Sequence, residues 1–356
     1  MRQPGEVRRQ RILAVLQARG SARVSDLADE LEVSVVTVRR DVEDLARAGK
    51  LRRGHGVARS VVPVEHSEPA VVEGGAVALV VPERHTYLYE TLHGARTALE
   101  EAGLRVVLHV SPKGPSAERP IVDRVMADRM SGLLIAPRWR NANEEYADYE
   151  WMAEVNVPMV IMERRPRQGG ALHAFDSVCS DHWYGTYLAI DHLVRLGHRR
   201  IVLAARDDSP TARAIRVAFR EIAASRPEIE DWAVVLSAPE AGAAGEEPPD
   251  FAAVLKERQA TAAVLHGDVD GLMLVQQLGD VGIRVPGDCS IVAYDDVVAA
   301  LGSPPLTAVA PPKAEVGRVA AELLLERLAR PGAWLSRRLE LLPELKVRGS
   351  TDRLTD

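Results

Sequence analysis

The 356-residue sequence predicts an α/β protein, in which a small helical module precedes a doubly wound parallel sheet domain of two lobes. From residue 76 onward, apolar runs of strand length alternate with amphipathic segments of about ten to fifteen residues, the pattern of βαβ units. Before residue 60 the pattern is helical and the charge is basic. There are too many βαβ units for one small sheet, so two similar lobes are expected.

Charge and cysteine usage narrow the class of protein. The chain carries a net charge of −6, but residues 1–59 hold 13 Arg or Lys against 8 Asp or Glu, or +5, which leaves −11 for the remainder. This asymmetry predicts a basic module attached to an acidic body. The two cysteines, Cys179 and Cys289, lack CxxC spacing, which favours a reducing compartment. With only strand-sized apolar runs and no signal-peptide pattern, we expect a cytoplasmic protein.

The basic module has the spacing of a helix-turn-helix. A helical pattern over residues 7–20 is followed by a short helix within "RVSDLADELEVS", for which Ser25 is the predicted N-cap. Ser34 is the predicted cap of a second helix, from Val35 to about Ala48, after a turn of roughly three residues. The residues of this second helix with core spacing are Val35, Val38, Val42 and Leu45.

In a helix-turn-helix, the N-terminal face of the second helix enters the DNA major groove. The side chains that could reach bases or phosphates there are Ser34, Val36, Thr37, Arg39 and Arg40. After the helix, "KLRRGHGVARS" predicts a hairpin that turns at "GHG", with Arg52, Arg53 and His55 placed to meet phosphate or the minor groove. The alternative is a helical bundle with a solvated charged face, which the basic hairpin makes less favourable.

The first sixty residues resemble the N-terminal winged helix-turn-helix of DeoR-type bacterial regulators. The resemblance lies in "VSDLADELEVS", "TVRRDVEDL", "AGKLRR" and the "HG" of the wing, although Val57 stands where a second glycine is usual. It implies a DNA-binding domain over residues 1–60. Residues 61–75, with prolines, glycines and glutamates but no periodicity, are predicted to be a linker.

Polar residues follow several of the predicted strands in the acidic body. A doubly wound sheet binds ligands at the carboxyl ends of its strands, and carboxylates and arginines beside an aromatic ring suit sugar hydroxyls. Convergence of five such loops favours a ligand site, although each loop end could instead be merely solvated. The candidates are His85, Thr86, Tyr87, Tyr89, Arg138, Trp139, Glu163, Arg164, Arg206, Asp207, Asp208, Thr211, Arg213 and Asp268.

The body resembles the effector domain of LacI/GalR regulators, which has the fold of type I periplasmic sugar-binding proteins. The resemblance lies in "VPMVIMERRP", "SDHWYGTYLAIDHLVRLGHRRIVLAA", "GIRVPGDCSIVAYDD", "SPPLTAVAPPKAEVGRVAAELLLERL" and "PELKVRGST". It implies a ligand-binding domain over residues 76–352. The expected lobes are lobe 1, about residues 76–176 and 297–330, and lobe 2, about residues 177–296 and 331–352.

This resemblance also implies roles for individual residues. Asp268 in "LHGD" corresponds to a carboxylate that commonly binds sugar hydroxyls, and Glu163 occupies the acidic position after the third strand. The family's effector-binding arginine falls on Ile215, so Arg213 or Arg216 would have to substitute for it. The expected ligand contacts are His85, Tyr87, Arg138, Glu163, Arg164, Trp183, Thr211, Arg213 and Asp268. The headpiece differs from the usual one of this family, and no hinge helix is evident in the linker.

Metal and catalytic sites are not expected. The spacing of His182, His192 and His198 fits neither one helical face nor a zinc motif. There is no GxSxG, no P-loop and no GxGxxG after the first strand, so no cofactor and no enzymatic activity are expected. Asp295 and Asp296 could mimic a catalytic pair, but a turn after "SIVAY" is the favoured interpretation.

Together the two resemblances imply a ligand-responsive transcriptional regulator, expected to repress a carbohydrate-utilisation operon and to leave its operator when a small sugar or sugar derivative binds. A homodimer, or a tetramer, would place its basic modules on a pseudo-palindromic DNA site. The alternatives are a cytosolic sugar-binding protein or carbohydrate enzyme on the same fold, and the sugar receptor of a transporter. The missing signal-peptide pattern and the basic module count against the receptor, and the absence of a catalytic constellation counts against the enzyme.

Overall fold

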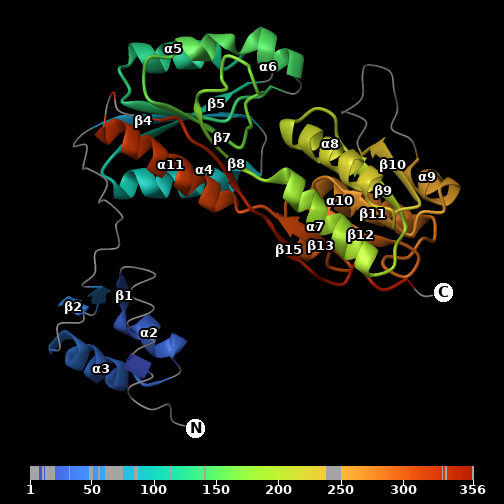
Figure 1. Cartoon of the computed structure of the whole chain (residues 1–356), viewed down its shortest axis with the longest axis horizontal. Helices are drawn as coiled ribbons and strands as arrows, with labels where there is room; N and C mark the ends of the chain where they lie inside the picture. The colour runs from blue at the N-terminus through green and yellow to red at the C-terminus, as the bar shows by residue number, and fades with distance from the viewer. Residues whose placement is uncertain are drawn as a thin grey trace. The chain divides into compact units, whose positions relative to one another are not determined.

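The chain divides into two compact units, Met1–Pro69 and Ala70–Asp356 (Figure 1). The computed structural model describes residues 8–9, 12, 21–31, 33–47, 51–54, 57–60, 75–83, 87–112, 114, 116–139, 142–237, 250–330, 332 and 335–354. The linker predicted over residues 61–75 lies almost wholly outside these ranges. Within them, no helix combines the length and the apolar composition that a membrane crossing needs.

The first unit packs helices against a three-stranded antiparallel sheet of order β1-β3-β2. Its elements are β1 (Ser21–Arg23), α2 (Val24–Glu30), α3 (Val35–Arg47), β2 (Leu51–Gly54) and β3 (Val57–Ser60). Of the helix predicted over residues 7–20, only residues 8, 9 and 12 are described, and all three are helical. The predicted helix pair and the two strands of the hairpin are confirmed, while the hairpin turn at residues 55–56 lies outside the described ranges.

One face of α3 builds the core of this unit together with α2 and the sheet. Val38, Val42 and Leu45 are buried, as their spacing predicts. The prediction for Val35 was wrong, because its side chain is 42% exposed. The first turn of α3 projects beyond the core, so the buried stripe begins at Val38. The described core residues are Ile12, Val24, Leu27, Ala28, Leu31, Val38, Val42, Leu45 and Leu51.

The two predicted helix caps have different outcomes. Ser34 caps α3, because its Oγ accepts a hydrogen bond from the main-chain N–H of Thr37 at 3.2 Å. Ser25 does not cap α2: the helix already begins at Val24, directly after β1, and the Ser25 hydroxyl donates to Asp26 at 2.9 Å.

The second unit contains two six-stranded sheets, one in each lobe. The first has the order β14-β8-β7-β6-β4-β5 and is parallel throughout, and the second has the order β10-β9-β11-β12-β13-β15, in which only β15 is antiparallel. The first sheet consists of β4 (Ala76–Pro82), β5 (Arg105–Ser111), β6 (Gly132–Ile135), β7 (Met159–Met162), β8 (Asp176–Ser180) and β14 (Arg338–Leu341). The second consists of β9 (Arg200–Ala205), β10 (Asp231–Leu236), β11 (Ala262–Leu265), β12 (Ser290–Tyr294), β13 (Thr307–Ala310) and β15 (Glu344–Lys346).

Helices cover both faces of each sheet, which gives the predicted doubly wound fold. In lobe 1, α4 and α11 lie on one face and α5 and α6 on the other (Figure 1). In lobe 2, one apolar cluster joins α7 and α8 to the sheet and another joins α9 and α10 to it. These helices are α4 (Leu88–Glu101), α5 (Arg119–Ala127), α6 (Ala142–Asp148), α7 (His182–Arg195), α8 (Pro210–Ser225), α9 (Phe251–Glu257), α10 (Asp268–Asp280) and α11 (Lys313–Ala329), with 3-10 turns η1 (Glu150–Glu154) and η3 (Ala299–Leu301).

The expected lobe boundaries need correction, because three strands belong to the lobe opposite the one predicted. β8 pairs with β7, so residues 177–180 extend lobe 1. β13 pairs with β12 and therefore belongs to lobe 2, whereas β14 pairs with β8 and belongs to lobe 1. The chain thus passes between the lobes after β8, after β13 and after β14. Which sheet receives a strand depends on its pairing partner, and that partner is distant in sequence.

Two glycines allow α4 and α11 to approach closely. A Cβ atom at Gly94 would lie 1.9 Å from the main-chain oxygen of Ala314, and one at Gly317 would lie 1.9 Å from that of Thr91. Neither distance can accommodate a side chain, and backbone atoms cannot swing aside. The α4–α11 contact in lobe 1 therefore requires glycine at both positions.

Candidate functional site

The face of α3 that points away from its core is polar and exposed. Ser34, Arg39 and Arg40 are exposed, and the Val36 side chain is 74% exposed. Thr37 is half-buried, and its hydroxyl lies 2.8 Å from the Ser34 hydroxyl. The five residues predicted to contact DNA from this helix therefore share one accessible surface at its N-terminal half.

The arginines of the first unit fall into two groups. Arg8 forms a bidentate pair with Asp41, at 2.5 and 3.2 Å. Arg9 and Arg47 both pair with Asp44, at 3.4 and 3.3 Å, and these contacts tie the module together. Arg39 and Arg40, in contrast, form no ion pair or hydrogen bond within the described ranges, so their guanidinium groups are free for an outside anion.

The hairpin carries the other predicted DNA contacts. Arg52 and Arg53 lie on β2, where the register places them opposite Arg59 and Ala58 of β3. His55 lies outside the described residues. A basic strand beside a helix whose N-terminal half exposes two arginines is the arrangement of a winged helix-turn-helix, in which the helix reads the major groove and the wing meets the backbone.

In the second unit, a cavity of about 390 Å³ lies at the carboxyl ends of the strands of both sheets. This is the position that the doubly wound fold predicts for a ligand. Lobe 1 contributes Glu83, Tyr87, Leu88, Arg138 and Arg164 to its wall. Lobe 2 contributes Arg206, Asp208, Ser209, Pro210, Thr211, His266, Gly267, Asp268, Val269, Asp270, Asp295 and Val297.

The structure brings together five of the predicted ligand contacts. Tyr87, Arg138, Arg164, Thr211 and Asp268 line the cavity. Three predicted contacts are not among the described lining residues, namely Glu163, Trp183 and Arg213. The remaining one, His85, lies outside the described residues.

Glu163 lies behind the cavity wall and holds Tyr87. The Tyr87 hydroxyl donates to Glu163 Oε1 at 3.1 Å, and the Ser180 hydroxyl donates to the same oxygen at 3.2 Å. Burial raises the pKa of Glu163, whose side chain is only 2% exposed. Its carboxyl group is therefore used by the protein itself, and it orients the tyrosine instead of facing a ligand.

Trp183 and Arg213 do not line the cavity in the described ranges. The Trp183 side chain is 43% exposed, and its ring stacks on Tyr187 with 6.0 Å between centroids. Arg213 is half-buried; burial lowers its pKa, while the nearby Glu145 carboxylate opposes that change. Arg216 is likewise absent from the described lining. Neither arginine takes the place expected for a family arginine, because both lie further along α8 than the cavity reaches.

Among the described lining residues of lobe 2, the arginine is Arg206. It donates two hydrogen bonds to the Asp208 carboxylate, at 3.0 and 3.1 Å, and a third to Asp270 at 3.4 Å. Nearby, burial lowers the pKa of His266 to about 4, and its Nδ1 has no hydrogen-bond partner. Arg206 and Asp208 were recognisable in sequence as loop residues after β9, but their approach to α10 depends on the fold.

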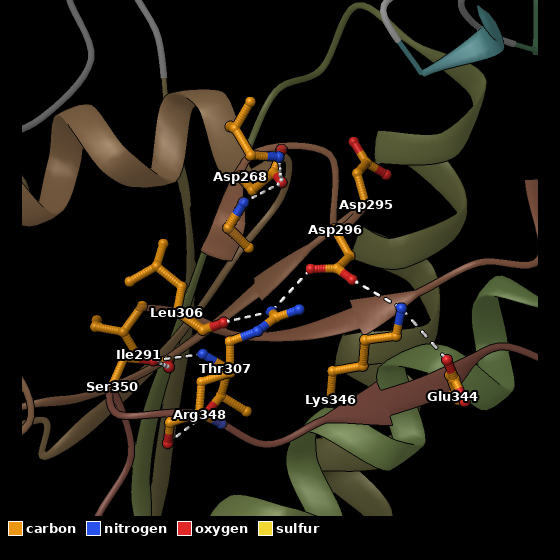
Figure 2. A network of polar contacts seen from close by, with 12 residues as sticks. Asp268, Ile291, Asp295, Asp296, Leu306, Thr307, Glu344, Lys346, Arg348 and Ser350 are labelled. Atoms are coloured by element: carbon orange, nitrogen blue, oxygen red, sulfur yellow. Dashed lines mark hydrogen bonds and ion pairs between the residues drawn. The ribbon is translucent and has the colours of Figure 1, made fainter. Parts of the chain in front are cut away.

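Asp268 has a structural contact as well as a place in the cavity. Its Oδ2 accepts hydrogen bonds from the main-chain N–H groups of Val298 and Ala299, at 2.5 and 2.8 Å, and so caps η3 (Figure 2). The side chain is 1% exposed. Its Oδ1 has no hydrogen-bond partner in the described part of the chain, which leaves that oxygen for a ligand in the cavity.

Asp295 lines the cavity, although the sequence did not predict it as a ligand contact. The turn predicted at Asp295 and Asp296 is confirmed by positive φ angles of 86° and 51°. The turn separates the two carboxylates: Asp296 pairs with Lys346 and Arg348, at 3.1 and 2.8 Å, whereas Asp295 lines the cavity with Oδ1 unpartnered (Figure 2). Burial and the nearby Asp268 carboxylate raise the pKa of Asp295 to about 7.

No metal centre is apparent in the described ranges, where no group of three or more His, Cys, Asp or Glu side chains is placed to hold an ion. His182 lies against Tyr294, with 3.2 Å between its Nδ1 and the hydroxyl. His192 and His198 bond to Thr351 and Thr261, each at 2.9 Å.

Two protein families match separate parts of the chain. The family described as DeoR-like helix-turn-helix domain matches residues 8–64, and the periplasmic binding protein-like domain family matches residues 190–351. These matches correspond to the first unit and to a large part of the second.

Curated relatives and solved structures extend this similarity to most of the chain. The arabinose metabolism transcriptional repressor of Geobacillus stearothermophilus is 26% identical over 344 residues, covering 92% of this chain and 90% of the relative. The transcriptional repressor PurR of Aliivibrio salmonicida is 29% identical over 282 residues, covering 78% of this chain and 81% of its own. Among solved structures, a Lac repressor dimer bound to operator and anti-inducer has a TM-score of 0.64 at 21% identity, covering 78% of this chain and 94% of that one.

A LacI-family regulator from Enterococcus faecium with bound ribose has a TM-score of 0.62 at 22% identity, covering 79% of this chain and 100% of that one. At this identity the structures show a shared fold, while the two family matches identify the parts of the chain. The chain thus joins a DeoR-like helix-turn-helix domain to a periplasmic binding protein-like domain, and over most of its length it is similar to transcriptional repressors.

Proposed function

We propose that this protein is a ligand-responsive repressor of a carbohydrate-utilisation operon, released from its operator when a small sugar or sugar derivative binds. The observation that carries the proposal is the cavity lined by both lobes of the second unit, on a chain whose first unit is a helix-turn-helix. The names of the relatives support it, since they are repressors, one of them of arabinose metabolism.

The DNA-binding surface would consist of Ser34, Val36, Thr37, Arg39 and Arg40 on α3, with Arg52, Arg53 and His55 on the wing. The unpaired guanidinium groups of α3 suit phosphate and guanine edges. A homodimer would present two such surfaces to a two-fold symmetric operator in the cytoplasm. The Lac repressor structure of similar fold is likewise a dimer bound to operator. A tetramer would add a second pair.

The ligand would act on the equilibrium between the lobes. A molecule that contacts both walls of the cavity favours the arrangement in which the walls lie closest, and so shifts the population of lobe arrangements. Lys313 connects the cavity to the passage between lobes: its Nζ donates to the main-chain oxygen of Asp295 at 2.5 Å and pairs with Glu90 of α4 at 3.2 Å. A ligand that contacts Asp295 would thus affect the position of the lobe-1 helix α11 through Lys313.

A gel-shift assay on the DNA upstream of the protein's own gene tests this proposal. The purified chain should shift the DNA with a strong dependence on salt concentration, because each phosphate contact releases a counterion. A sugar that raises the melting temperature of the protein should reduce the shift. Absence of any salt-dependent shift, with and without sugars, would contradict the regulator and favour a sugar-binding protein or enzyme.

A further inference from the structure

The lobe-1 wall of the cavity holds a buried arginine without an ion pair. The Arg164 side chain is 5% exposed. Its Nε donates to the main-chain oxygen of Pro137 at 2.6 Å, and its Nη1 donates to that of Glu163 at 2.7 Å. These contacts fix the plane of the guanidinium, but they supply no negative charge. Its Nη2 has no partner in the described part of the chain.

Arg138 lines the same wall and also lacks an ion pair within the described ranges. Its main-chain N–H donates to Glu118 at 3.2 Å, but its guanidinium enters no ion pair within the described ranges, and its Nη1 is buried without a hydrogen-bond partner. The described lobe-1 lining includes one carboxylate, Glu83, and it pairs with neither arginine. The Glu163 and Glu118 carboxylates favour the charged form of Arg164, but neither forms an ion pair with it in the described ranges. A wholly or partly buried guanidinium without an ion pair is costly, so a wall that holds two of them is suited to a ligand that brings a negative charge.

The lobe-2 wall is different, because most of its carboxylates already have partners within the protein. Asp208 and Asp270 share Arg206, and Asp268 accepts two main-chain hydrogen bonds on Oδ2. Asp295 is poised between its acid and its carboxylate form at neutral pH, since its pKa is raised to about 7. This wall offers hydrogen-bonding oxygens to hydroxyl groups without requiring a cation from the ligand.

We propose that the effector is a polyhydroxylated anion, a sugar acid or a sugar phosphate, whose anionic group binds Arg138 and Arg164 and whose hydroxyls face the aspartates of lobe 2. This proposal rests on the proposed function and names the class of ligand for the same cavity. Planar guanidinium groups match the paired oxygens of carboxylate and phosphate, with charge-assisted hydrogen bonds. A volume of about 390 Å³ lies at the lower end of the usual range for small-molecule sites, which suits a monosaccharide.

The difference in charge between the two walls also sets the orientation of the ligand. The anionic group sits at lobe 1 and the ring hydroxyls reach lobe 2, so one ligand bonds both walls. A neutral sugar leaves the two lobe-1 guanidinium groups without an ion pair, and it should bind more weakly than its own acid or phosphate.

Thermal-shift and calorimetric titrations of the full chain with matched ligands test the proposal. The probes are D-galactose, D-galacturonate and D-galactose 6-phosphate, the corresponding glucose set, L-arabinose with L-arabinonate, and inorganic phosphate, all at equal ionic strength. At least one anion should raise the melting temperature and bind at least tenfold more tightly than its neutral counterpart. Whether a carboxylate or a phosphate does so distinguishes the two sources of charge.

Three variants connect the result to the arginines. Arg138→Gln should lower the affinity for the anion at least tenfold and leave that for the neutral sugar unchanged. Arg164→Lys keeps the charge and should cause a smaller loss. Arg165→Gln is the matched control, because that neighbouring side chain is 60% exposed and pairs with Glu340 away from the described cavity lining; it should bind the anion as the wild type does.

The proposal is overturned if a neutral sugar binds as tightly as its acid and phosphate, if no anion of the panel stabilises the protein, or if Arg138→Gln retains full anion affinity. A gel shift of the upstream DNA by the same ligand-free protein separates these outcomes from failure of the regulator itself. DNA binding that persists while anions fail contradicts only the ligand class.

Discussion

Arg40 and Arg47 lie on the same helix, yet only Arg47 has a carboxylate partner in the described ranges, Asp44 at 3.3 Å. Arg40→Ala should therefore remove a side chain that is free to meet DNA. We expect roughly a tenfold loss of affinity, and a fall of about 0.9 in the slope of log affinity against log salt if one phosphate contact is lost. Fluorescence anisotropy with labelled upstream DNA at several salt concentrations measures both.

Arg47→Ala is the control, because it removes the same charge at the other end of α3. Equal affinity and equal salt slope for the two variants would move the DNA-reading surface away from the N-terminal half of the helix.

Asp268 caps η3 with one carboxylate oxygen and leaves the other accessible, so two substitutions separate these roles. Asp268→Ala should destabilise the protein by about 1–2 kcal/mol, because two main-chain N–H groups lose their acceptor. Asp268→Asn keeps one acceptor oxygen and should lose much less stability, while ligand affinity falls in both. Chemical denaturation and ligand titration of the two variants give these quantities; unchanged ligand affinity in Asp268→Asn would remove Asp268 from the ligand contacts.

Asp295 makes stability depend on pH in a defined direction. Its pKa is raised from its ordinary value of 3.8 to about 7, so the folded state holds a proton that the unfolded state releases between these values. Its contribution to stability is therefore present at low pH and is lost as the pH rises to about 7. Asp295→Asn removes this dependence and should raise the melting temperature at pH 8, with a difference that shrinks towards pH 4.

Asp296→Asn is the control with the opposite sign. Burial acts to raise the pKa of Asp296, but hydrogen bonds from Arg348 and Lys346 outweigh it and lower the pKa. This variant should be less stable than the wild type at pH 8. Two results at pH 8 would contradict the charge distribution described around the cavity. One is a higher melting temperature for Asp296→Asn than for the wild type, and the other is no increase in melting temperature for Asp295→Asn.

The loops of the cavity are visible in the sequence, whereas the directions of their side chains are not. Strand ends are visible in the pattern, so Tyr87, Arg138 and Asp268 could be chosen. Glu163 and Arg164 are adjacent, yet Arg164 lines the cavity and Glu163 lies behind it, where the backbone has a φ of +52°. The sequence reveals neither feature. Asp295 was missed because its position beside Asp268 depends on the pairing of β11 with β12.

At the scale of elements, most strands could be predicted because parallel strands buried on both faces are continuous apolar runs. β8, with the sequence DSVCS, was not predicted, since it is half polar although wholly buried. The burial of its Asp176 carboxylate is compensated by an ion pair with Arg327 of α11 and by a hydrogen bond from the main-chain N–H of Arg337. Such compensation comes from residues more than a hundred positions away, so no local pattern reports it.

The contact between α4 and α11 gives a prediction about packing. Gly317→Ala places a methyl group against the main-chain oxygen of Thr91, which cannot move without shifting α4. We expect a loss of stability of about 1–3 kcal/mol. Gly279→Ala on α10 is the control: a Cβ there meets nothing within 4 Å, so alanine should be neutral or stabilise by up to about 1 kcal/mol.

Urea unfolding of both glycine variants measures these differences. Equal stability of Gly317→Ala and the wild type would show that the two helices are not held at the distance described.

At the scale of the whole molecule, the chain combines a DeoR-type module with a second unit in which the chain crosses three times between two lobes. Strands β13 and β15 belong to the sheet of lobe 2, whereas β14 belongs to that of lobe 1. Three chain segments therefore connect the lobes. Each connection can act as part of a hinge, and the cavity lies between the strands' carboxyl ends on either side. In the function proposed above, ligand binding and DNA binding are coupled through one equilibrium, and such coupling is reciprocal.

The central claim is that occupancy of this cavity changes the affinity of the first unit for DNA. The most direct measurement is the dissociation constant for labelled upstream DNA, by fluorescence anisotropy, without ligand and with a saturating amount of the sugar or sugar anion that most stabilises the protein. A repressor of this type should bind DNA at least fivefold more weakly when liganded, within the range usual for allosteric coupling. Equal affinity in the two states would contradict the claim.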